Sequence, residues 1–307
     1  SQKGLISFCE FESKQIEVEI EGIKKKKTVG YKVCPKSSPL FQEFKIWQVL
    51  NNVQVIDKSG AKQSLEQDEK EILFAELSIK DKLSKTDALK LLYKNYKELD
   101  LNFKDIEGNR TQATLFKAYQ RIIELSGHGE YDFTKLPAAE SKEIVSSVFN
   151  GLGYNTDILS FNSNLEGKEF ENQPLYLFWH LLYSFEGDDS TSGNEKLLNK
   201  ISELYGFERE YAKILANINF EPDYGSLSTK AIRKILPYLK DGNEFSLACA
   251  YAGYKHSKDS LTKEELVNKI LKDKLDILPK NSLRNPVVEK ILNQMINVVN
   301  TTIDVYG

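Results

Sequence analysis

Three cations gather on one side of an expected helix between residues 226 and 242. The stretch reads SLSTKAIRKILPYLKDG, and its apolar residues recur at three- and four-residue spacing, which is typical of a helix with one buried side. Lys230, Arg233 and Lys234 share the opposite side. A cation in the first turn gains nothing from its own helix dipole, whereas an outside anion meets both that cation and the free N–H groups. The arrangement suits a phosphate, although three basic residues that simply face water fit the same pattern.

The stretch GNRT at 108–111 is a second candidate anion site. Gly108 permits a tight turn, and Arg110 projects from it. Asn109 or Thr111 can cap the helix that follows and point its N-terminus at an anion. This turn therefore joins the basic helix as a candidate phosphate contact.

Two further groups of cations are candidates of the same kind. One is the run EGIKKKK near an expected turn, with Lys24, Lys25, Lys26 and Lys27. Protection of a strand edge against aggregation explains these lysines as well as a phosphate contact does. The other group is Lys117 and Arg121, which alternate with aromatic residues in LFKAYQRIIEL. They can contact a nucleic acid. Alternatively, the aromatic residues lie at the edge of the hydrophobic core and the two cations lie on the surface beside them.

Catalytic and metal-binding patterns are not found in this sequence. His128, His180 and His256 have no metal-ligand spacing, and we interpret His180, inside the aromatic stretch FWHLLY, as a core residue. The three cysteines are scattered, which argues against both a disulfide framework and a zinc site. No acid–base pair or nucleophile has a discernible partner, so we do not expect a stand-alone enzyme.

Charge is distributed unevenly along the 307 residues, whose formal net charge is −3. Residues 1–63 carry a net +4 and residues 226–307 also carry +4, which leaves −11 for residues 64–225. This asymmetry suggests that the two ends face an anionic partner. No apolar run is long enough to cross a membrane, and the start of the sequence lacks a signal-peptide pattern, so we expect a protein of the cytoplasm without membrane contact.

The elements that position these cations are mostly helices. The first 34 residues alternate apolar and polar side chains in SFCEFE, QIEVEI and TVGYKV, three stretches separated by polar turns, which predicts a β-hairpin or small sheet. Ser38 and Pro39 open an expected apolar helix, and everything after residue 60 is expected to be helical. The predicted fold is mainly α, an irregular multi-helix arrangement with a small N-terminal β-hairpin. We predict three segments, 1–60, 61–187 and 188–307.

Four phrases of the sequence together resemble one family. They are CEFE with KVCPKSSPLFQEFKIWQVLNNV (9–12 and 32–53), LNFKDIEGNRT (101–111), SLSTKAIRKILPYLKDGNEFSLACAYAGY (226–254) and LRNPVVEKILNQMINVVNTTIDVYG (283–307). In this order they resemble the recognition lobe of the CRISPR type II RNA-guided DNA endonucleases, in its type II-C-like form. The first phrase is similar to the start of that lobe after the bridge helix. The last is similar to the helix that leads into the second RuvC-like segment.

The resemblance implies a non-catalytic lobe that binds guide RNA, tracrRNA and the heteroduplex of guide and target DNA in antiviral defence of a bacterium. Guide pairing would read the sequence, while the protein holds the A-form backbone. The endonuclease activity, with its Mg²⁺, would belong to the other nuclease domains of the parent protein, and no cofactor is expected in this chain. The expected backbone contacts are Lys230, Arg233 and Lys234, with Lys45, Arg110 and one or more of the lysines at 24–27.

Two other kinds of binding partner remain open. The chain can be a helical protein-interaction module whose basic ends serve solubility or bind an acidic protein. Within the family resemblance, the lobe can also be the docking site of a phage-encoded CRISPR inhibitor. A preference for A-form duplex over other polyanions would distinguish nucleic-acid binding from these alternatives.

Overall fold

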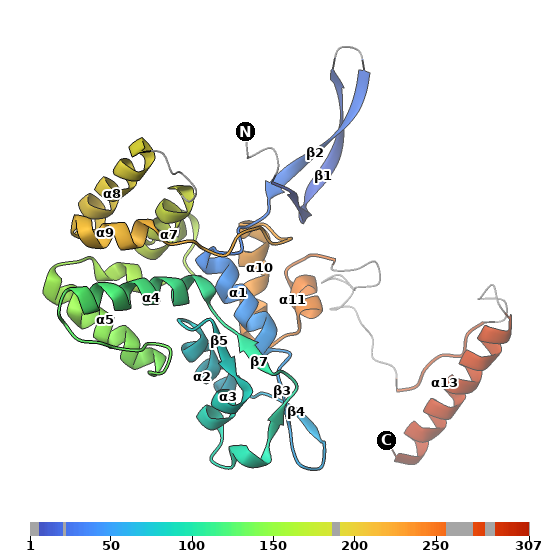
Figure 1. The fold of residues 1–307 in the computed structure, drawn as a ribbon. Coiled ribbons are helices and arrows are strands. Elements are labelled where there is room, and N and C mark those ends of the chain that lie inside the picture. The colour runs from blue at the N-terminus through green and yellow to red at the C-terminus, as the bar shows by residue number, and fades with distance from the viewer. Residues whose placement is uncertain (1–5, 21–22, 186–190, 256–272, 280–285, 307) are drawn as a thin grey trace. The chain divides into compact units, whose positions relative to one another are not determined.

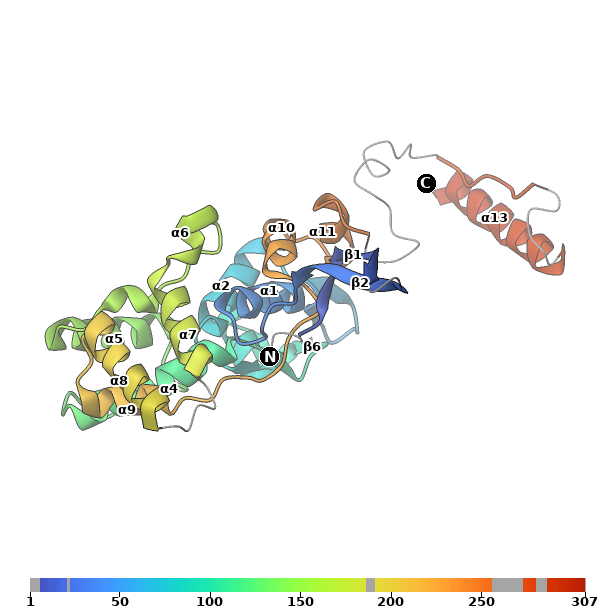
Figure 2. The ribbon, with the colours of Figure 1, turned by 90° about the horizontal axis from the view of Figure 1, so that it is seen from above.

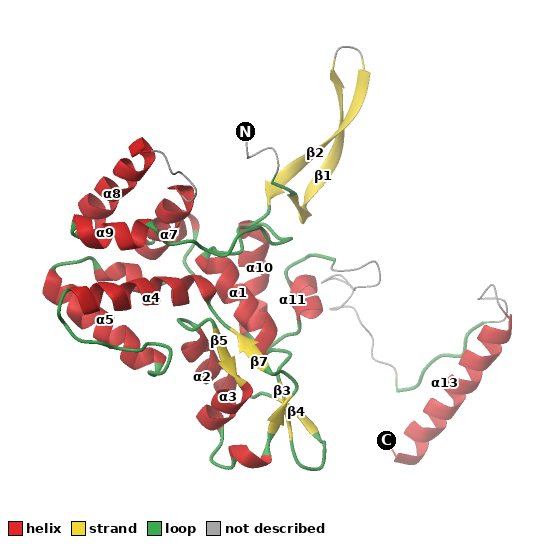
Figure 3. Ribbon diagram, viewed as in Figure 1, coloured by secondary structure: helices red, strands yellow, loops and turns green. Residues whose placement is uncertain are grey.

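The computed structural model describes residues 6–20, 23–185, 191–255, 273–279 and 286–306, and these are mainly α-helical, as expected from the sequence (Figures 1 and 3). The chain divides into two compact units, Ser1–Ser260 and Leu261–Gly307. The boundaries near residues 60 and 187 stay predictions. The expected helix TKEELVNKIL (262–271) lies outside the described residues.

The first unit begins with the expected hairpin. Strands β1 (Phe8–Ile20) and β2 (Ile23–Lys32) pair antiparallel, and their register shifts between Phe8 and Ser13. SFCEFE and QIEVEI, separated by a turn in our expectation, are parts of one strand, and the lysines at 24–27 lie in β2 itself. Gly30 faces the irregularity with φ +150°, and a Cβ there would lie 2.2 Å from the carbonyl oxygen of Glu12. Only glycine therefore permits this close approach of the strands.

Helix α1 (Pro39–Leu50) is buried on two sides, as its apolar sequence predicts. Ser38 is its N-cap and accepts a hydrogen bond from the Phe41 N–H at 3.1 Å. One side of α1, with Leu40, Phe44 and Trp47, packs against α10 (Thr229–Lys240) and α11 (Phe245–Tyr251). The other side, with Ile46 and Leu50, belongs to a separate hydrophobic cluster.

That separate cluster contains short strands that the sequence did not reveal (Figure 3). Strands β4 (Lys62–Ser64), β3 (Gln54–Ile56) and β6 (Asp100–Leu101) form one sheet, while β5 (Lys82–Ser84) pairs with β7 (Asp105–Glu107). The same cluster includes residues of helices α2 (Gln67–Leu77) and α3 (Lys85–Leu92), and the 3₁₀ turn η2 (Tyr96–Glu98) packs against it. The expectation of helix throughout was wrong here, because strands of two or three residues are too short to show a period of two.

The largest hydrophobic cluster is helical and aromatic. Its elements are α4 (Arg110–Leu125), α5 (Ala138–Leu152), η3 (Thr156–Leu159), α7 (Pro174–Phe185), α8 (Thr191–Tyr205) and α9 (Arg209–Ala216). Phe149 is fully buried and its ring meets the rings of Tyr119, Tyr154 and Phe207 at centroid distances of 5.1, 5.5 and 5.5 Å. These contacts join α4, α5 and the segment between α8 and α9.

Hydrogen bonds between distant parts of the chain place α10 beside the hairpin. The Cys34 N–H donates to the Leu227 carbonyl at 2.8 Å, and the Gly225 N–H donates to the Cys34 carbonyl at 2.9 Å. At the other end, the Asn51 amide donates to the Leu239 carbonyl at 2.8 Å. Helix α10 therefore runs along α1 with the base of β1 near its start (Figure 2).

The second unit contains α13 (Pro286–Tyr306), a helix that the sequence predicts. Two asparagines of α13 bind residues 273–279: Asn300 exchanges hydrogen bonds of 2.8 Å with the backbone of Leu275, and Asn293 exchanges them with Leu278 at 2.8 and 3.1 Å. Many of its apolar side chains are exposed: Val288, Ile291, Leu292, Met295, Val298, Val299, Ile303 and Val305.

Candidate nucleic-acid interface

Helix α10 separates its apolar and cationic residues as the spacing predicts. Ser228 is the N-cap and accepts from the Ala231 N–H at 3.1 Å. The apolar side is buried: Ala231, Ile232, Ile235, Leu236 and Leu239. Lys230 and Lys234 reach the surface, and Arg233 is half-buried.

A half-buried carboxylate from the hairpin holds Lys230 and Lys234 of this helix. Glu12, at the base of β1, lies 3.0 Å from the Lys230 Nζ and 3.6 Å from the Lys234 Nζ. The Tyr254 hydroxyl donates a hydrogen bond to the same carboxylate. Burial works against the charged form of Glu12, but the hydrogen bonds from Tyr254 and Lys230 and the two positive charges hold its pKa below the usual value. The hydrogen bond to Glu12 in turn raises the pKa of Lys230, so both groups are charged at neutral pH.

Lys230, Arg233 and Lys234 each also lie over an aromatic ring. The Lys230 Nζ is 4.5 Å from the centre of the Tyr31 ring, the Lys234 Nζ is 5.2 Å from Tyr254, and the Arg233 guanidinium is 4.4 Å from Phe170. Arg233 Nη2 also donates to the Leu165 carbonyl at 2.8 Å, just before α6 (Gly167–Glu171). Rings and hydrogen bonds thus fix where the charges stand before any anion arrives.

A pocket of about 580 Å³ opens beside these cations. Its lining includes Lys230, Arg233 and Lys234 on the α10 side and the carboxylates Glu166 and Glu171 near α6. Tyr31 and the polar residues Ser163 and Asn164 complete much of the wall. Positive charge therefore exceeds negative charge in the lining and is concentrated on α10. Two of the three cations also pair with Glu12, which lies outside the lining.

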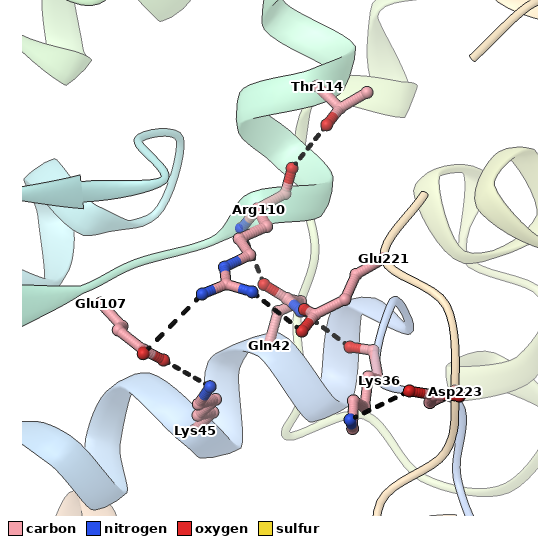
Figure 4. Close-up of polar contacts among 8 residues, drawn as sticks. All are labelled: Lys36, Gln42, Lys45, Glu107, Arg110, Thr114, Glu221 and Asp223. Atoms are coloured by element: carbon pink, nitrogen blue, oxygen red, sulfur yellow. Dashed lines mark hydrogen bonds and ion pairs between the residues drawn. The ribbon is translucent and has the colours of Figure 1, made fainter. Parts of the chain in front are cut away.

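The GNRT turn is a junction between three parts of the chain (Figure 4). Arg110 Nη1 lies 3.0 Å from Glu221 and Nη2 lies 3.7 Å from Glu107. Lys45 of α1 pairs with Glu107 as well, and this hydrogen bond lowers the pKa of Glu107 despite partial burial. The Arg110 N–H donates to the Gln42 side chain at 2.8 Å. A phosphate at Arg110 or Lys45 would have to compete with these protein groups, and contact with nucleic acid by either residue stays a prediction.

Two residues of the turn are buried. Asn109 caps α4 through a hydrogen bond of 2.9 Å from the Gln112 N–H, as the sequence predicts, but it is 8% exposed. Thr111 is 1% exposed, and its hydroxyl donates to the Ser37 carbonyl at 2.7 Å. Both side chains are buried and hydrogen-bonded within the protein, and contact with nucleic acid at these two positions stays a prediction.

The remaining candidates lie on other elements. Lys117 is exposed on α4, and Arg121 on the same helix pairs with Glu124 at 3.2 Å. Lys26 and Lys27 are exposed on β2, while the side chains of Lys24 and Lys25 lie outside the described part. These positions stay predictions. The expectation that His180 is a core residue was wrong, since its side chain is exposed on α7.

Sequence reasoning missed Glu12, Tyr31, Phe170 and Tyr254 as partners of the basic helix. They come from β1, β2, α6 and the turn after α11, which only the tertiary fold brings together. The phrase CEFE contains Glu12, but nothing local distinguishes it from the other glutamates of the hairpin.

Among the described residues, no three His, Cys, Asp or Glu side chains gather in a way that could hold a metal ion. A search of the same residues finds no helix with the length and hydropathy needed to cross a membrane.

The lowered pKa of Glu12 predicts a pH dependence of stability. A carboxylate whose pKa is lower in the folded state stabilises the fold above its unfolded pKa, and this contribution is lost as pH falls through the folded value. We expect the wild type to have a larger free energy of unfolding than Glu12→Gln at neutral pH. This difference should shrink as pH falls from about 6 through 4.5 and below. Urea unfolding at a series of pH values measures this. The exposed Glu203→Gln on α8 is the control, and an advantage of the wild type over Glu12→Gln that does not change with pH would contradict the assignment.

Comparison with known proteins leaves the family open. No family model matches the chain. Among solved structures, the crystal structure of the Type II-C Cas9 enzyme from Actinomyces naeslundii aligns with 90% of this chain and 23% of that chain, at 12% identity and a TM-score of 0.38. A TM-score below 0.5 is too low to carry an argument about fold or function. The chain spans less than a quarter of that enzyme's length, so activities of a whole enzyme can only be proposed here.

Proposed function

We propose that this chain binds the sugar-phosphate backbone of guide RNA and of the RNA–DNA heteroduplex, as the recognition lobe of a CRISPR-associated RNA-guided DNA endonuclease. The observation that carries the proposal is the cationic wall of α10, where Lys230, Arg233 and Lys234 face one pocket and each lies over a ring. The four sequence phrases that resemble this family support it. The helical fold is compatible with such a lobe.

Binding by α10 would position the nucleic acid and leave sequence reading to base pairing. Lysine meets phosphate as a point charge, and Arg233 already uses Nη2 on the Leu165 carbonyl. A Lys230 ammonium has three N–H donors, so it can hold Glu12 and still donate to a phosphate. The resulting contact should be strongly salt-dependent, because released counterions provide much of its free energy.

The same proposal names the other partners. tracrRNA would contribute part of the bound RNA, and the nuclease domains of the parent would supply the hydrolysis with their Mg²⁺. The setting would be the cytoplasm of a bacterium. This chain would contribute binding, without a catalytic residue of its own.

The direct test compares an RNA–DNA heteroduplex with a DNA duplex of the same sequence. We expect fluorescence anisotropy to show at least tenfold tighter binding of the heteroduplex at 100 mM salt, roughly 1.4 kcal/mol, with heparin as competitor. The physical reason is that fixed cations match one backbone geometry. Equal affinity for both duplexes and for heparin would indicate a general polyanion surface, and absence of binding would reject the proposal.

Protein contact is a second candidate function. The exposed apolar side chains of α13 favour it, because a row of such side chains on one helix is typical of a surface that another protein covers. The partner would be another domain of the parent or a phage-encoded inhibitor. Size-exclusion chromatography of the wild type and of the Val298→Asp variant tests whether α13 mediates association.

A further inference from the structure

The outer part of the β1–β2 hairpin is an arm outside the hydrophobic clusters. Residues 14–20 and 23–29 pair in regular register, with Lys14 opposite Val29, Ile16 opposite Lys27 and Glu17 opposite Lys26. Apart from the base of the hairpin, its residues belong to none of the three clusters. Figure 1 shows the two strands extending away from α1 and α10.

The arm has two chemically different faces. Side chains alternate along a strand, and directly opposed residues of an antiparallel pair share a face. We call one face the cationic face; among residues with described side chains it comprises Lys14, Ile16, Val18, Lys27 and Val29. The other, the mixed-charge face, comprises Gln15, Glu17, Glu19, Lys26 and Thr28. Among the residues with described side chains, the cationic face has two positive charges and no acid, whereas the mixed-charge face has charges of both signs.

On the cationic face, the charged side chains are exposed and the apolar ones are half-buried. Lys14 on β1 and Lys27 on β2 are exposed and lie diagonally across this face, because Lys14 is opposite Val29 and Ile16 is opposite Lys27. Ile16, Val29 and Val18 are half-buried, although the arm has only two strands. An apolar patch with one cation on each strand matches a partner that is apolar in the middle and anionic at both sides. Charge complementarity thus points to a nucleic acid groove.

The flat shape of the arm favours the minor groove of an A-form duplex over the major groove. The A-form minor groove is wide and shallow and displays ribose, with a phosphate backbone on each side. The base edges in a major groove are recognised by side chains that form hydrogen bonds, and the side chains of Ile16 and Val18 form no hydrogen bonds. Strands lie about 4.8 Å apart, so a two-stranded arm lies flat on a shallow surface but cannot enter the A-form major groove, which is deep and narrow.

We infer that the cationic face of the hairpin arm docks on the minor groove of an A-form duplex, with Ile16 and Val18 against ribose and Lys14 and Lys27 toward the two backbones. The partner class rests on the proposed function, but the surface is separate from α10. The mixed-charge face stays in solvent.

Two adjacent lysines provide the sharpest test. Lys26 and Lys27 are both exposed but lie on opposite faces of the arm. The full chain is acetylated briefly with and without a saturating RNA–DNA heteroduplex, and the modified lysines are quantified by mass spectrometry. We expect the duplex to protect Lys14 and Lys27 about fivefold or more and to leave Lys26 within twofold of its free reactivity. Equal protection of Lys26 and Lys27 would overturn the inference.

A matched pair of variants supplies a second measurement. Ile16→Thr with Val18→Thr removes apolar surface without changing charge or strand propensity, and we expect about tenfold weaker heteroduplex binding. Glu17→Thr with Lys26→Thr is the control on the other face, also neutral in net charge, and should stay within twofold. Neither pair lies in a hydrophobic cluster, so circular dichroism should show a folded chain for both.

The outcomes separate this inference from the proposed function. If the wild type binds heteroduplex but Lys27 stays reactive and the Ile16→Thr/Val18→Thr variant binds normally, only the arm inference fails. If the wild type does not bind heteroduplex, the proposed function fails as well. If polyglutamate protects Lys27 as well as the duplex does, the arm recognises acidic polymers in general, which also overturns the inference.

Discussion

Replacing Lys230, Arg233 and Lys234 together by glutamine is expected to weaken heteroduplex binding about 100-fold and to reduce the slope of log K against log salt by about three. Each cation that meets a phosphate releases roughly one counterion, so three lost contacts remove three units of slope. At about 1 kcal/mol for each contact, the loss in affinity is about two orders of magnitude. Fluorescence anisotropy between 50 and 300 mM KCl gives both quantities.

The control for this variant keeps the same change in net charge. Lys58, Lys82 and Lys90 are surface lysines on other elements, with side chains 71%, 58% and 50% exposed. Their triple replacement by glutamine should change affinity less than threefold, since surface charges beyond a Debye length are screened. Equal losses in the two triple variants would mean that only net charge matters. An unchanged slope in the α10 variant would remove α10 from the interface.

Arg233 needs its own check because it has a structural contact. Its hydrogen bond to the Leu165 carbonyl and its position over Phe170 tie α10 to α6. Arg233→Lys keeps the charge but loses the planar guanidinium. If this variant binds as the wild type does, the charge at 233 is what the nucleic acid recognises. If it binds as weakly as Arg233→Gln with an unchanged melting temperature, the geometry of the guanidinium matters instead.

The second large effect is on stability, and we expect Phe149→Ala to lower the free energy of unfolding by about 3–5 kcal/mol. Phe149 is fully buried and contacts the rings of Tyr119, Tyr154 and Phe207. Its removal leaves a cavity that neighbouring rings, each held by other contacts, cannot fill. Urea unfolding followed by circular dichroism measures the loss.

Leu125→Ala is the matched control for the core. Leu125 ends α4 in the same helical region but is 44% exposed, so we expect a loss below about 1 kcal/mol. A loss for Phe149→Ala no larger than that of Leu125→Ala would show that the cluster relaxes around the missing ring. The binding experiments can then use any variant whose melting temperature matches that of the wild type.

Local sequence patterns predicted the long helices correctly. Apolar spacing predicted α10, and Ser38 with Pro39 predicted the start of α1. The sequence offered Asn109 or Thr111 as the cap of α4, and Asn109 is the cap. These succeed because capping and amphipathic burial depend on residues within one or two turns of each other. The strands β3 to β7 were missed because each depends on a distant partner strand and contains too few residues to show a pattern.

The candidate site also has one part that local sequence predicts and one part that depends on distant residues. The sequence by itself determined that Lys230, Arg233 and Lys234 share one side of a helix, because helix geometry follows from local spacing. Only the tertiary structure decided what surrounds them: Glu12 and Tyr31 from the hairpin, Phe170 from α6 and Tyr254 after α11. It also buried Thr111 and Asn109, which look accessible in sequence. Burial and charge pairing arise from contacts between residues far apart in the chain, and no local pattern encodes them.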